Sequence, residues 1–220
     1  MSQDCRIYLI SPPLIENLDE FAKTLNDALS INKEADGDVA CFQLRLKKPN
    51  GDAVDDQKIL HTADKLLPIC ARHDISFLIN DRPDIAKQVG ADGVHIGQND
   101  ASYKDARILL GEKASIGVTC HNSRHLALLA GEAGADYVAF GAFFPTRTKI
   151  TETIADVELL TWWQEATTVP CVAIGGITAE NCPALVRAGA DFLAVSNAIW
   201  NHKDGPAQGI KSLNAAIAKA

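Results

Sequence analysis

Residues 90–94 read Gly-Ala-Asp-Gly-Val, and this short pattern decides the fold because it returns twice along the chain. Residues 134–138 (Gly-Ala-Asp-Tyr-Val) and 189–193 (Gly-Ala-Asp-Phe-Leu) repeat it at offsets of 44 and 55 residues. A glycine in this setting suits the left-handed conformation that ends a helix, and the aspartate then leads into an apolar strand. Each offset predicts two strand–helix units of roughly 22 to 28 residues, the unit size of a compact (β/α) barrel.

The rest of the chain continues this alternation. Apolar segments too short for helices predict eight buried parallel strands at 6–10, 39–46, 76–79, 93–96, 115–118, 137–140, 171–174 and 192–195. Amphipathic segments between them predict helices over 17–31, 55–72, 125–133 and 179–188, and a last helix carrying Ile210, Leu213 and Ile217. Thr178 and Asn122 are candidate helix caps.

Eight such units in 220 residues predict an α/β fold, one (β/α)8 TIM barrel, with a single domain over 1–220. An open doubly wound sheet is the alternative. It often has a glycine-rich first turn, whereas the first turn here is Ser11-Pro12-Pro13, so the barrel is favoured.

Composition narrows the class of protein. Hydrophobic residues make up 47% of the chain and charged residues 22%, as in a folded globular protein, and no long apolar segment predicts a membrane span. The net charge of −7 argues against nucleic acid or an anionic membrane as a partner. The absence of a leader-like N-terminus and six irregularly spaced cysteines predict a cytoplasmic protein with reduced, buried thiols. Self-association is left open.

Polar side chains gather where the predicted strands end, which is where barrel enzymes place their active sites. Asp81 and Asp100 follow neighbouring strands, and paired carboxylates with substrate oxygens and water suit Mg²⁺. Arg45, Lys47 and Lys149 add positive charge, which favours a pyrophosphate-like polyanion as the substrate group. Asp81 as a simple cap of the next helix is the structural alternative.

A second anion site is predicted near the last two strands. Residues 175–178 (Gly-Gly-Ile-Thr) are expected to open a helix, and Ser196 follows the eighth strand, so backbone N–H groups there can hold a phosphate. His121 and His125 are spaced to share a metal, although a strand-end residue and a surface helix residue is the simpler interpretation.

Several of these segments resemble the thiamine-phosphate synthase family. They are residues 43–47 (Gln-Leu-Arg-Leu-Lys), 77–82 (Phe-Leu-Ile-Asn-Asp-Arg), 90–98 with Asp100, 144–149 (Phe-Pro-Thr-Arg-Thr-Lys) and 173–177 (Ala-Ile-Gly-Gly-Ile). They occur in the family's order between about residue 6 and residue 200. The resemblance implies a barrel enzyme that joins hydroxymethylpyrimidine diphosphate to a phosphorylated hydroxyethylthiazole, with loss of pyrophosphate before the thiazole nitrogen attacks.

The residues of this chain that match the family's motifs are expected to have the same roles as in the family. The resemblance implies that Asp81 and Asp100 ligate Mg²⁺ and that Gln43 orients the pyrimidine. The diphosphate would be held by Arg45, Lys47, Asn80 and Lys149. The thiazole phosphate would be held by Thr146, Thr148, Gly176, Val195 and Ser196. Lys149 and Thr119 take the catalytic positions.

The chain departs from the family pattern at three points. Thr119 replaces a usual serine, Ala142 replaces a usual proline, and residues 150–160 contain no glycine. Three other functions stay open beside the synthase: a thiazole tautomerase with a proton-transfer histidine near His121, a non-catalytic regulator, and another phosphate-binding barrel enzyme. The carboxylates Asp81 and Asp100, together with Lys149, favour the synthase, since the tautomerase needs no metal–pyrophosphate site.

Overall fold

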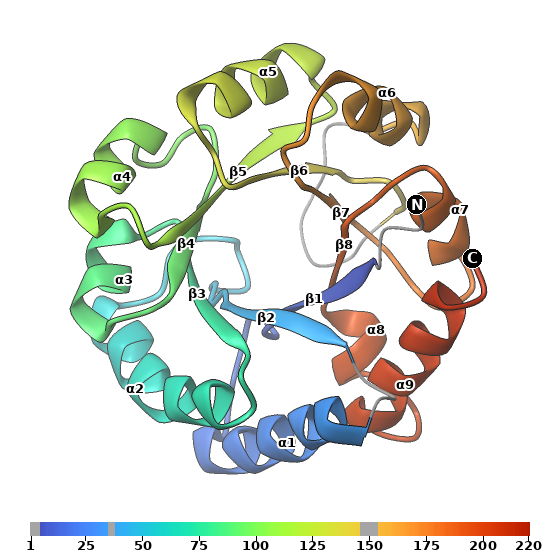
Figure 1. Ribbon diagram of the computed structural model, residues 1–220. Helices are drawn as coiled ribbons and strands as arrows, with labels where there is room; N and C mark the ends of the chain where they lie inside the picture. The colour runs from blue at the N-terminus through green and yellow to red at the C-terminus, as the bar shows by residue number, and fades with distance from the viewer. Residues whose placement is uncertain (1–4, 35–37, 146–153) are drawn as a thin grey trace.

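The computed structural model describes residues 5–34, 38–145 and 154–220. Its eight strands run parallel and close into one barrel in sequence order, with β8 pairing back onto β1 (Figure 1). The strands are β1 (Arg6–Ile10), β2 (Val39–Leu44), β3 (Ser76–Asn80), β4 (Gly93–Ile96), β5 (Ser115–His121), β6 (Tyr137–Gly141), β7 (Cys171–Ile174) and β8 (Phe192–Val195). The predicted (β/α)8 TIM barrel is confirmed.

Helices form a ring outside the strands (Figure 1). They are α1 (Leu18–Ser30), α2 (Asp56–Arg72), α3 (Pro83–Val89), α4 (Tyr103–Leu110), α5 (Arg124–Ala133), α6 (Glu158–Ala166), α7 (Cys182–Arg187), α8 (Asn197–Trp200) and α9 (Pro206–Ile217), with a short 3₁₀ turn, η1 (Ile31–Glu34), after α1. Within the described ranges, no helix combines the length and the apolar character that crossing a bilayer requires.

Two predicted helix caps are wrong. Helix α7 begins at Cys182 and not near 179, because Pro183 favours the first turn and the Asn181 side chain instead accepts a hydrogen bond from the Thr178 N–H at 2.8 Å. Ser123, and not Asn122, caps α5 by accepting from the Leu126 N–H at 3.2 Å. Residues 175–178 therefore form a loop, and the helix start that was expected to bind phosphate there does not exist.

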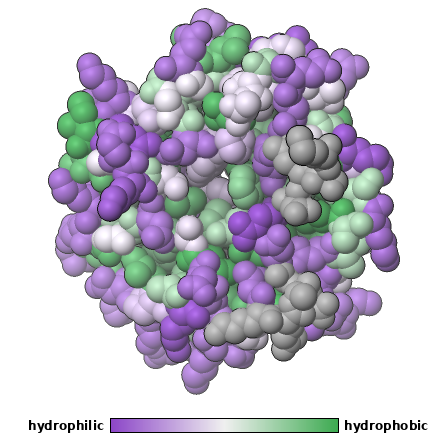
Figure 2. Space-filling model, viewed as in Figure 1, coloured by the Kyte–Doolittle hydropathy of each residue, from purple (hydrophilic) through white to green (hydrophobic). Residues whose placement is uncertain are grey.

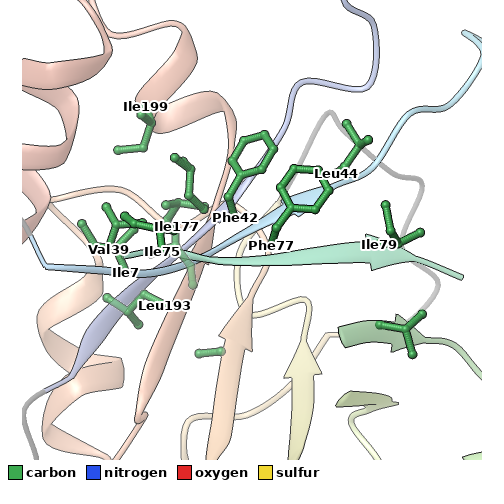
Figure 3. Close-up of a cluster of buried hydrophobic side chains, with 14 of the residues drawn as sticks. Ile7, Val39, Phe42, Leu44, Ile75, Phe77, Ile79, Ile177, Leu193 and Ile199 are labelled. Atoms are coloured by element: carbon green, nitrogen blue, oxygen red, sulfur yellow. The ribbon is translucent and has the colours of Figure 1, made fainter. Parts of the chain in front are cut away.

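Two apolar layers hold the barrel together, because successive strand residues point alternately outward and inward. The outer layer lies between strands and helices and includes Phe42 and Phe77, whose ring centroids are 5.8 Å apart (Figure 3). The inner layer fills the barrel; its buried members are Tyr8, Ile10, Cys41, Leu78, Tyr137, Ala139, Val172 and Ala194. The barrel is a packed core, and only its mouth is available to a substrate.

The repeated Gly-Ala-Asp turns hold neighbouring strands in pairs. Their glycines Gly90, Gly134 and Gly189 adopt φ values of 68°, 97° and 99°, which side chains disfavour. A carboxylate oxygen of each aspartate accepts a 2.7 Å hydrogen bond from a backbone N–H of the preceding strand; the donors to Asp92, Asp136 and Asp191 are Phe77, Ile116 and Cys171. The repeat therefore locks β3 to β4, β5 to β6 and β7 to β8 at the barrel end opposite the mouth.

All six cysteines are free and buried, as predicted. Burial raises the pKa of the Cys120 thiol to about 12, so this residue beside the mouth stays a protonated thiol near neutral pH. Cys120 is therefore poorly suited to act as a nucleophile near neutral pH.

Candidate active site

Two amide side chains, one near the end of β2 and one at the end of β3, are hydrogen-bonded to each other at the mouth of the barrel. Gln43 is buried, and its Nε2 donates a 2.7 Å hydrogen bond to Oδ1 of Asn80. Strand β2 ends at Leu44, so Arg45 lies on the loop beyond it and not on the strand as predicted, and Lys47 follows on the same loop. The structure nevertheless brings Gln43 and Asn80, two predicted binding residues, into direct contact.

Asp81 anchors the charged part of the mouth. It has a φ of 66°, an uncommon conformation for a residue with a side chain, and its N–H donates to the His95 carbonyl at 2.8 Å. Its Oδ2 accepts a 2.9 Å hydrogen bond from the ammonium of Lys47, and both side chains are about a quarter exposed. Backbone strain of this kind is concentrated at functional sites, and here it fixes a carboxylate at the edge of the barrel.

Asp100 lies beside Asp81. Both line a cavity of about 440 Å³ and a second cavity of about 170 Å³. Oδ2 of Asp100 accepts a 2.7 Å hydrogen bond from the Gly97 N–H. Partial burial raises the pKa of Asp100, and the neighbouring negative charge of Asp81 raises it further. The predicted pair of carboxylates therefore does converge, and two like charges this close favour a cation between them.

Arg45 is a half-buried cation whose guanidinium forms no hydrogen bond with any residue of the described ranges. Burial lowers its pKa, and the nearby Asp81 partly opposes that shift. Its backbone N–H donates to Oγ of the buried Ser11 at 2.9 Å, which fixes where the side chain starts. An arginine that is partly desolvated without a hydrogen-bonding partner is suited to receive an anion.

A chain of buried and half-buried polar side chains runs through the barrel to Thr119. The Tyr8 and Tyr137 hydroxyls are 2.9 Å apart, the Tyr137 hydroxyl is 3.1 Å from Nδ1 of His95, and Nε2 of His95 is 2.8 Å from Oγ1 of Thr119. We call Tyr8, Tyr137, His95 and Thr119 the interior hydroxyl–imidazole chain. Of these four residues, only Thr119 was predicted from the sequence to act in the site, although strand alternation could have placed the other three on inward faces.

The end of β8 and the loop after β7 approach the mouth from the other side. Gly176 has a φ of 61°, and a Cβ there would lie 2.4 Å from the Pro145 carbonyl oxygen, so only glycine fits. Ser196 donates through its Oγ to the Ser11 carbonyl at 3.2 Å. Ser11 thus contacts both Arg45 and Ser196 and joins the two predicted anion sites. The Val195 side chain is buried in the outer apolar layer, which leaves its backbone as the part that can face a ligand.

The remaining predicted residues fall on one segment. Thr146, Thr148 and Lys149 lie outside the described residues, so their roles stay predictions. The chain leads to them through Phe143 and Phe144, whose N–H groups donate to Ile174 and Gly175 carbonyls, both at 3.1 Å. Residues 143–145 therefore lie beside the β7 loop, next to Gly176.

Residues 5–34, 38–145 and 154–220 contain no group of three or more His, Cys, Asp or Glu side chains arranged to hold a metal ion. The predicted pair His121 and His125 accordingly gains no third ligand there. A metal at Asp81 and Asp100 would complete its shell with oxygens from substrate and water, which is how proteins commonly bind Mg²⁺. In the view of Figure 2, hydrophilic residues cover most of the periphery of this face and also lie near its centre.

Comparison with known proteins identifies relatives for this fold and site. The family model described as thiamine monophosphate synthase matches residues 7–199. A thiamine-phosphate synthase from Rhodospirillum centenum is 57% identical over 211 residues, which are 96% of this chain and 97% of the relative. One from Hyphomonas neptunium is 50% identical over 96% of this chain and 92% of the relative.

The solved structures agree. A thiamine phosphate pyrophosphorylase from Pyrococcus furiosus superposes with a TM-score of 0.79 at 26% identity, covering 99% of this chain and 98% of that one. An orotidine 5'-phosphate decarboxylase from Pyrococcus horikoshii shares the fold alone, at 14% identity and a TM-score of 0.63. From the match along nearly its whole length, the chain belongs to the thiamine monophosphate synthase family.

Proposed function

We propose that this enzyme couples 4-amino-5-hydroxymethyl-2-methylpyrimidine diphosphate to hydroxyethylthiazole phosphate and releases pyrophosphate. The bond between the pyrimidine methylene carbon and the diphosphate oxygen breaks, and its electron pair leaves with pyrophosphate. The lone pair of the thiazole nitrogen then forms the new carbon–nitrogen bond of thiamine phosphate. The reaction is the transfer of a pyrimidine-methyl group, and it requires stabilisation of a departing polyanion.

The observation that carries this proposal is the guanidinium of Arg45, half-buried and without a hydrogen-bond acceptor among the described residues, at the same mouth as Asp81 and Asp100. Cations and carboxylates side by side suit a diphosphate that is bound together with a divalent metal. A neutral substrate would leave the Arg45 charge uncompensated in a partly dry setting.

The two carboxylates fit Mg²⁺, since both supply hard oxygen ligands on one cavity, and burial followed by the negative charge of Asp81 raises the pKa of Asp100. When bound, Mg²⁺ would neutralise negative charge on the diphosphate and make it a better leaving group. Lys47, held on Asp81, and Arg45 would bind the remaining diphosphate oxygens, and Lys149 is proposed to join them from its loop.

The amide pair assigns two further contacts. Because Oδ1 of Asn80 accepts from Gln43, the Asn80 amide N–H groups remain to donate to a diphosphate oxygen. Oε1 of Gln43 remains as an acceptor for the amino group of the pyrimidine. We assign the thiazole phosphate to the opposite side of Ser11, where Gly176, Ser196 and the Val195 backbone lie and where Thr146 and Thr148 are proposed to complete the site.

The test mixes purified protein with both substrates and follows thiamine phosphate by chromatography and pyrophosphate by a coupled assay, with Mg²⁺ and with a chelator. Formation of both products in equal amounts, only with Mg²⁺, is expected. Lys149→Ala should lower the rate of product formation in a single turnover, as expected for a residue that acts in the chemical step. Conversion of a thiazole isomer without any diphosphate would instead identify a tautomerase acting through a residue such as His121.

A further inference from the structure

We propose that the interior hydroxyl–imidazole chain fixes the direction of the Thr119 hydroxyl, so that Thr119 donates a hydrogen bond to the pyrimidine diphosphate. His95, Tyr137 and Tyr8 are then positioning residues that act through Thr119. This inference rests on the proposed function for its substrate. The arrangement of protons in the chain follows from the protein alone and can be tested separately.

The buried end of the interior hydroxyl–imidazole chain, at Tyr8, determines which group is the donor in each of its hydrogen bonds. Tyr8 is buried, and within the described part of the protein its hydroxyl is hydrogen-bonded to Tyr137 alone. If the Tyr8 hydroxyl donates a hydrogen bond to the Tyr137 oxygen, the Tyr137 hydroxyl donates to Nδ1 of His95. The His95 N–H at Nε2 then donates to Oγ1 of Thr119. The protons of Tyr8, Tyr137 and His95 in these hydrogen bonds then all have acceptors. The reverse order would leave the Tyr8 proton buried without one, which proteins avoid.

The tyrosines keep their protons under physiological conditions. Burial raises the pKa of Tyr8 and of Tyr137 well above the ordinary value of 10, because a phenolate would lose its hydration inside the barrel. Each tyrosine therefore supplies one proton to the chain and neither becomes a pure acceptor. The His95 and Tyr137 rings also stack at 5.7 Å between centroids with an angle of 22°, which limits rotation of the imidazole.

Thr119 stands at the open end of the chain. Its Oγ1 accepts from His95, so its own proton points away from the histidine, and its carbonyl accepts a 2.5 Å hydrogen bond from Nε2 of Gln98, two residues before Asp100. Thr119 is thus attached on one side to the barrel interior and on the other to the loop of the proposed metal ligand. A hydroxyl oriented beforehand stabilises a departing oxyanion without having to reorganise during the reaction.

Two amide variants of His95 distinguish a role in positioning the Thr119 hydroxyl from a role in packing the barrel interior. In His95→Gln, the side-chain NH₂ reaches the place of Nε2 and can still donate to Thr119; in His95→Asn, the shorter amide reaches only the place of Nδ1. We expect His95→Asn to lower kcat roughly tenfold, the effect of one hydrogen bond lost in the transition state, with little change in KM for the thiazole phosphate. His95→Gln should retain most of kcat.

A double-mutant cycle supplies the decisive comparison. In a Thr119→Val background, His95→Asn should cause no further loss of kcat, whereas Thr119→Ser should keep the effect of His95→Asn. Leu78→Val, in the same inner layer but outside the chain, is the control, and its effect should multiply with that of Thr119→Val. Unchanged kcat in His95→Asn, or full multiplication with Thr119→Val, would overturn the positioning role.

The tautomer of His95, and with it the direction of the hydrogen bonds, can be measured in the protein without any substrate. Nitrogen-15 spectra of the protein labelled at histidine, with His95 assigned from the resonances missing in His95→Gln, should show the tautomer protonated at Nε2. A tautomer protonated at Nδ1 would overturn the inference. If the wild-type protein forms no thiamine phosphate, the proposed function fails, while this measurement still decides the direction of the chain.

Discussion

The ammonium of Lys47 lies 2.9 Å from Oδ2 of Asp81, on a residue whose backbone is held at a φ of 66°. The pair is formed across the loop after β2 and the end of β3, and Asp100 lies beside it on the same cavity. The ion pair with Lys47 compensates the charge of Asp81 in this structure. A divalent metal and a diphosphate would take over that role and free Lys47 to bind phosphate oxygens.

The first prediction concerns this carboxylate. Asp81→Asn keeps the shape of the side chain but removes the charge that would bind Mg²⁺, so turnover at ordinary Mg²⁺ should fall on the order of a hundredfold or more. Raising the Mg²⁺ concentration should restore part of it. Initial rates as a function of Mg²⁺ measure both effects. Asp64→Asn, on the exposed face of α2, is the matched control and should behave as wild type; equal rates for the Asp81 variant would refute the assignment.

Arg45 is expected to bind the diphosphate directly. Arg45→Gln removes a charge-assisted hydrogen-bond donor worth about 1.5–3 kcal/mol, so pyrophosphate should bind roughly 10- to 100-fold more weakly in the presence of Mg²⁺. Titration calorimetry on wild type and variant gives the ratio. Arg72→Gln, on an exposed arginine at the end of α2, should leave the affinity unchanged. Equal affinities for wild type and Arg45→Gln would show that the anion lies elsewhere.

Trp163 is predicted to stabilise the fold without acting in catalysis. It is 1% exposed, its ring packs 5.7 Å from that of Phe140, and its Nε1 donates to the Val169 carbonyl at 2.7 Å. Trp163→Ala should lower the free energy of unfolding by about 3–5 kcal/mol and leave kcat per folded molecule unchanged. Urea denaturation and active-site titration test the two parts. Trp162→Ala, which loses a cation–π contact to Arg124, should cost much less.

The aspartates of the repeated turn should matter for stability alone. Asp191 is buried and accepts from the Cys171 N–H at 2.7 Å and from Nε2 of Gln164 at 2.9 Å. Asp191→Ala would leave the Cys171 N–H without an acceptor, at about 1–3 kcal/mol, whereas Nε2 of Gln164 would keep its 2.7 Å hydrogen bond to the Gly189 carbonyl. A lower urea midpoint with normal kcat in folded protein is expected. A loss of kcat without a loss of stability would contradict this structural role.

Stability should fall in alkali because the thiols are buried. Burial raises the pKa of Cys5, Cys70, Cys120 and Cys171 from the ordinary value of 9.0 to about 12, and that of Cys182 to about 11. Above pH 9, these thiols ionise in the unfolded chain and stay protonated in the folded one. Each therefore lowers the free energy of unfolding by about 1.4 kcal/mol per pH unit until the folded pKa is reached.

Urea midpoints at pH 8 and pH 10, under reducing conditions, measure this slope. Cys120→Ala should reduce the pH dependence of the free energy of unfolding by the contribution of one thiol, about 1.4 kcal/mol per pH unit. Identical midpoints at the two pH values would show that the thiols ionise equally in both states.

The amino-acid sequence was sufficient to predict the barrel and its charged mouth. Four strands have the predicted bounds, and the Gly-Ala-Asp turns lie where the repeat placed them, because strand periodicity and the left-handed glycine are properties of a few neighbouring residues. The helix start near 179 was predicted wrongly, since Thr178 and Asn181 both resemble caps and only the three-dimensional path of the loop selects between them.

Local sequence thus determined which segments become strands and which strand ends carry Asp81, Asp100 and Arg45. Only closure of the barrel decided that Tyr8 of β1, His95 of β4 and Tyr137 of β6 meet Thr119 of β5 in its centre. Inward side chains from strands far apart in sequence contact one another because the sheet curves back on itself, and no pattern of neighbouring residues encodes which of them will touch.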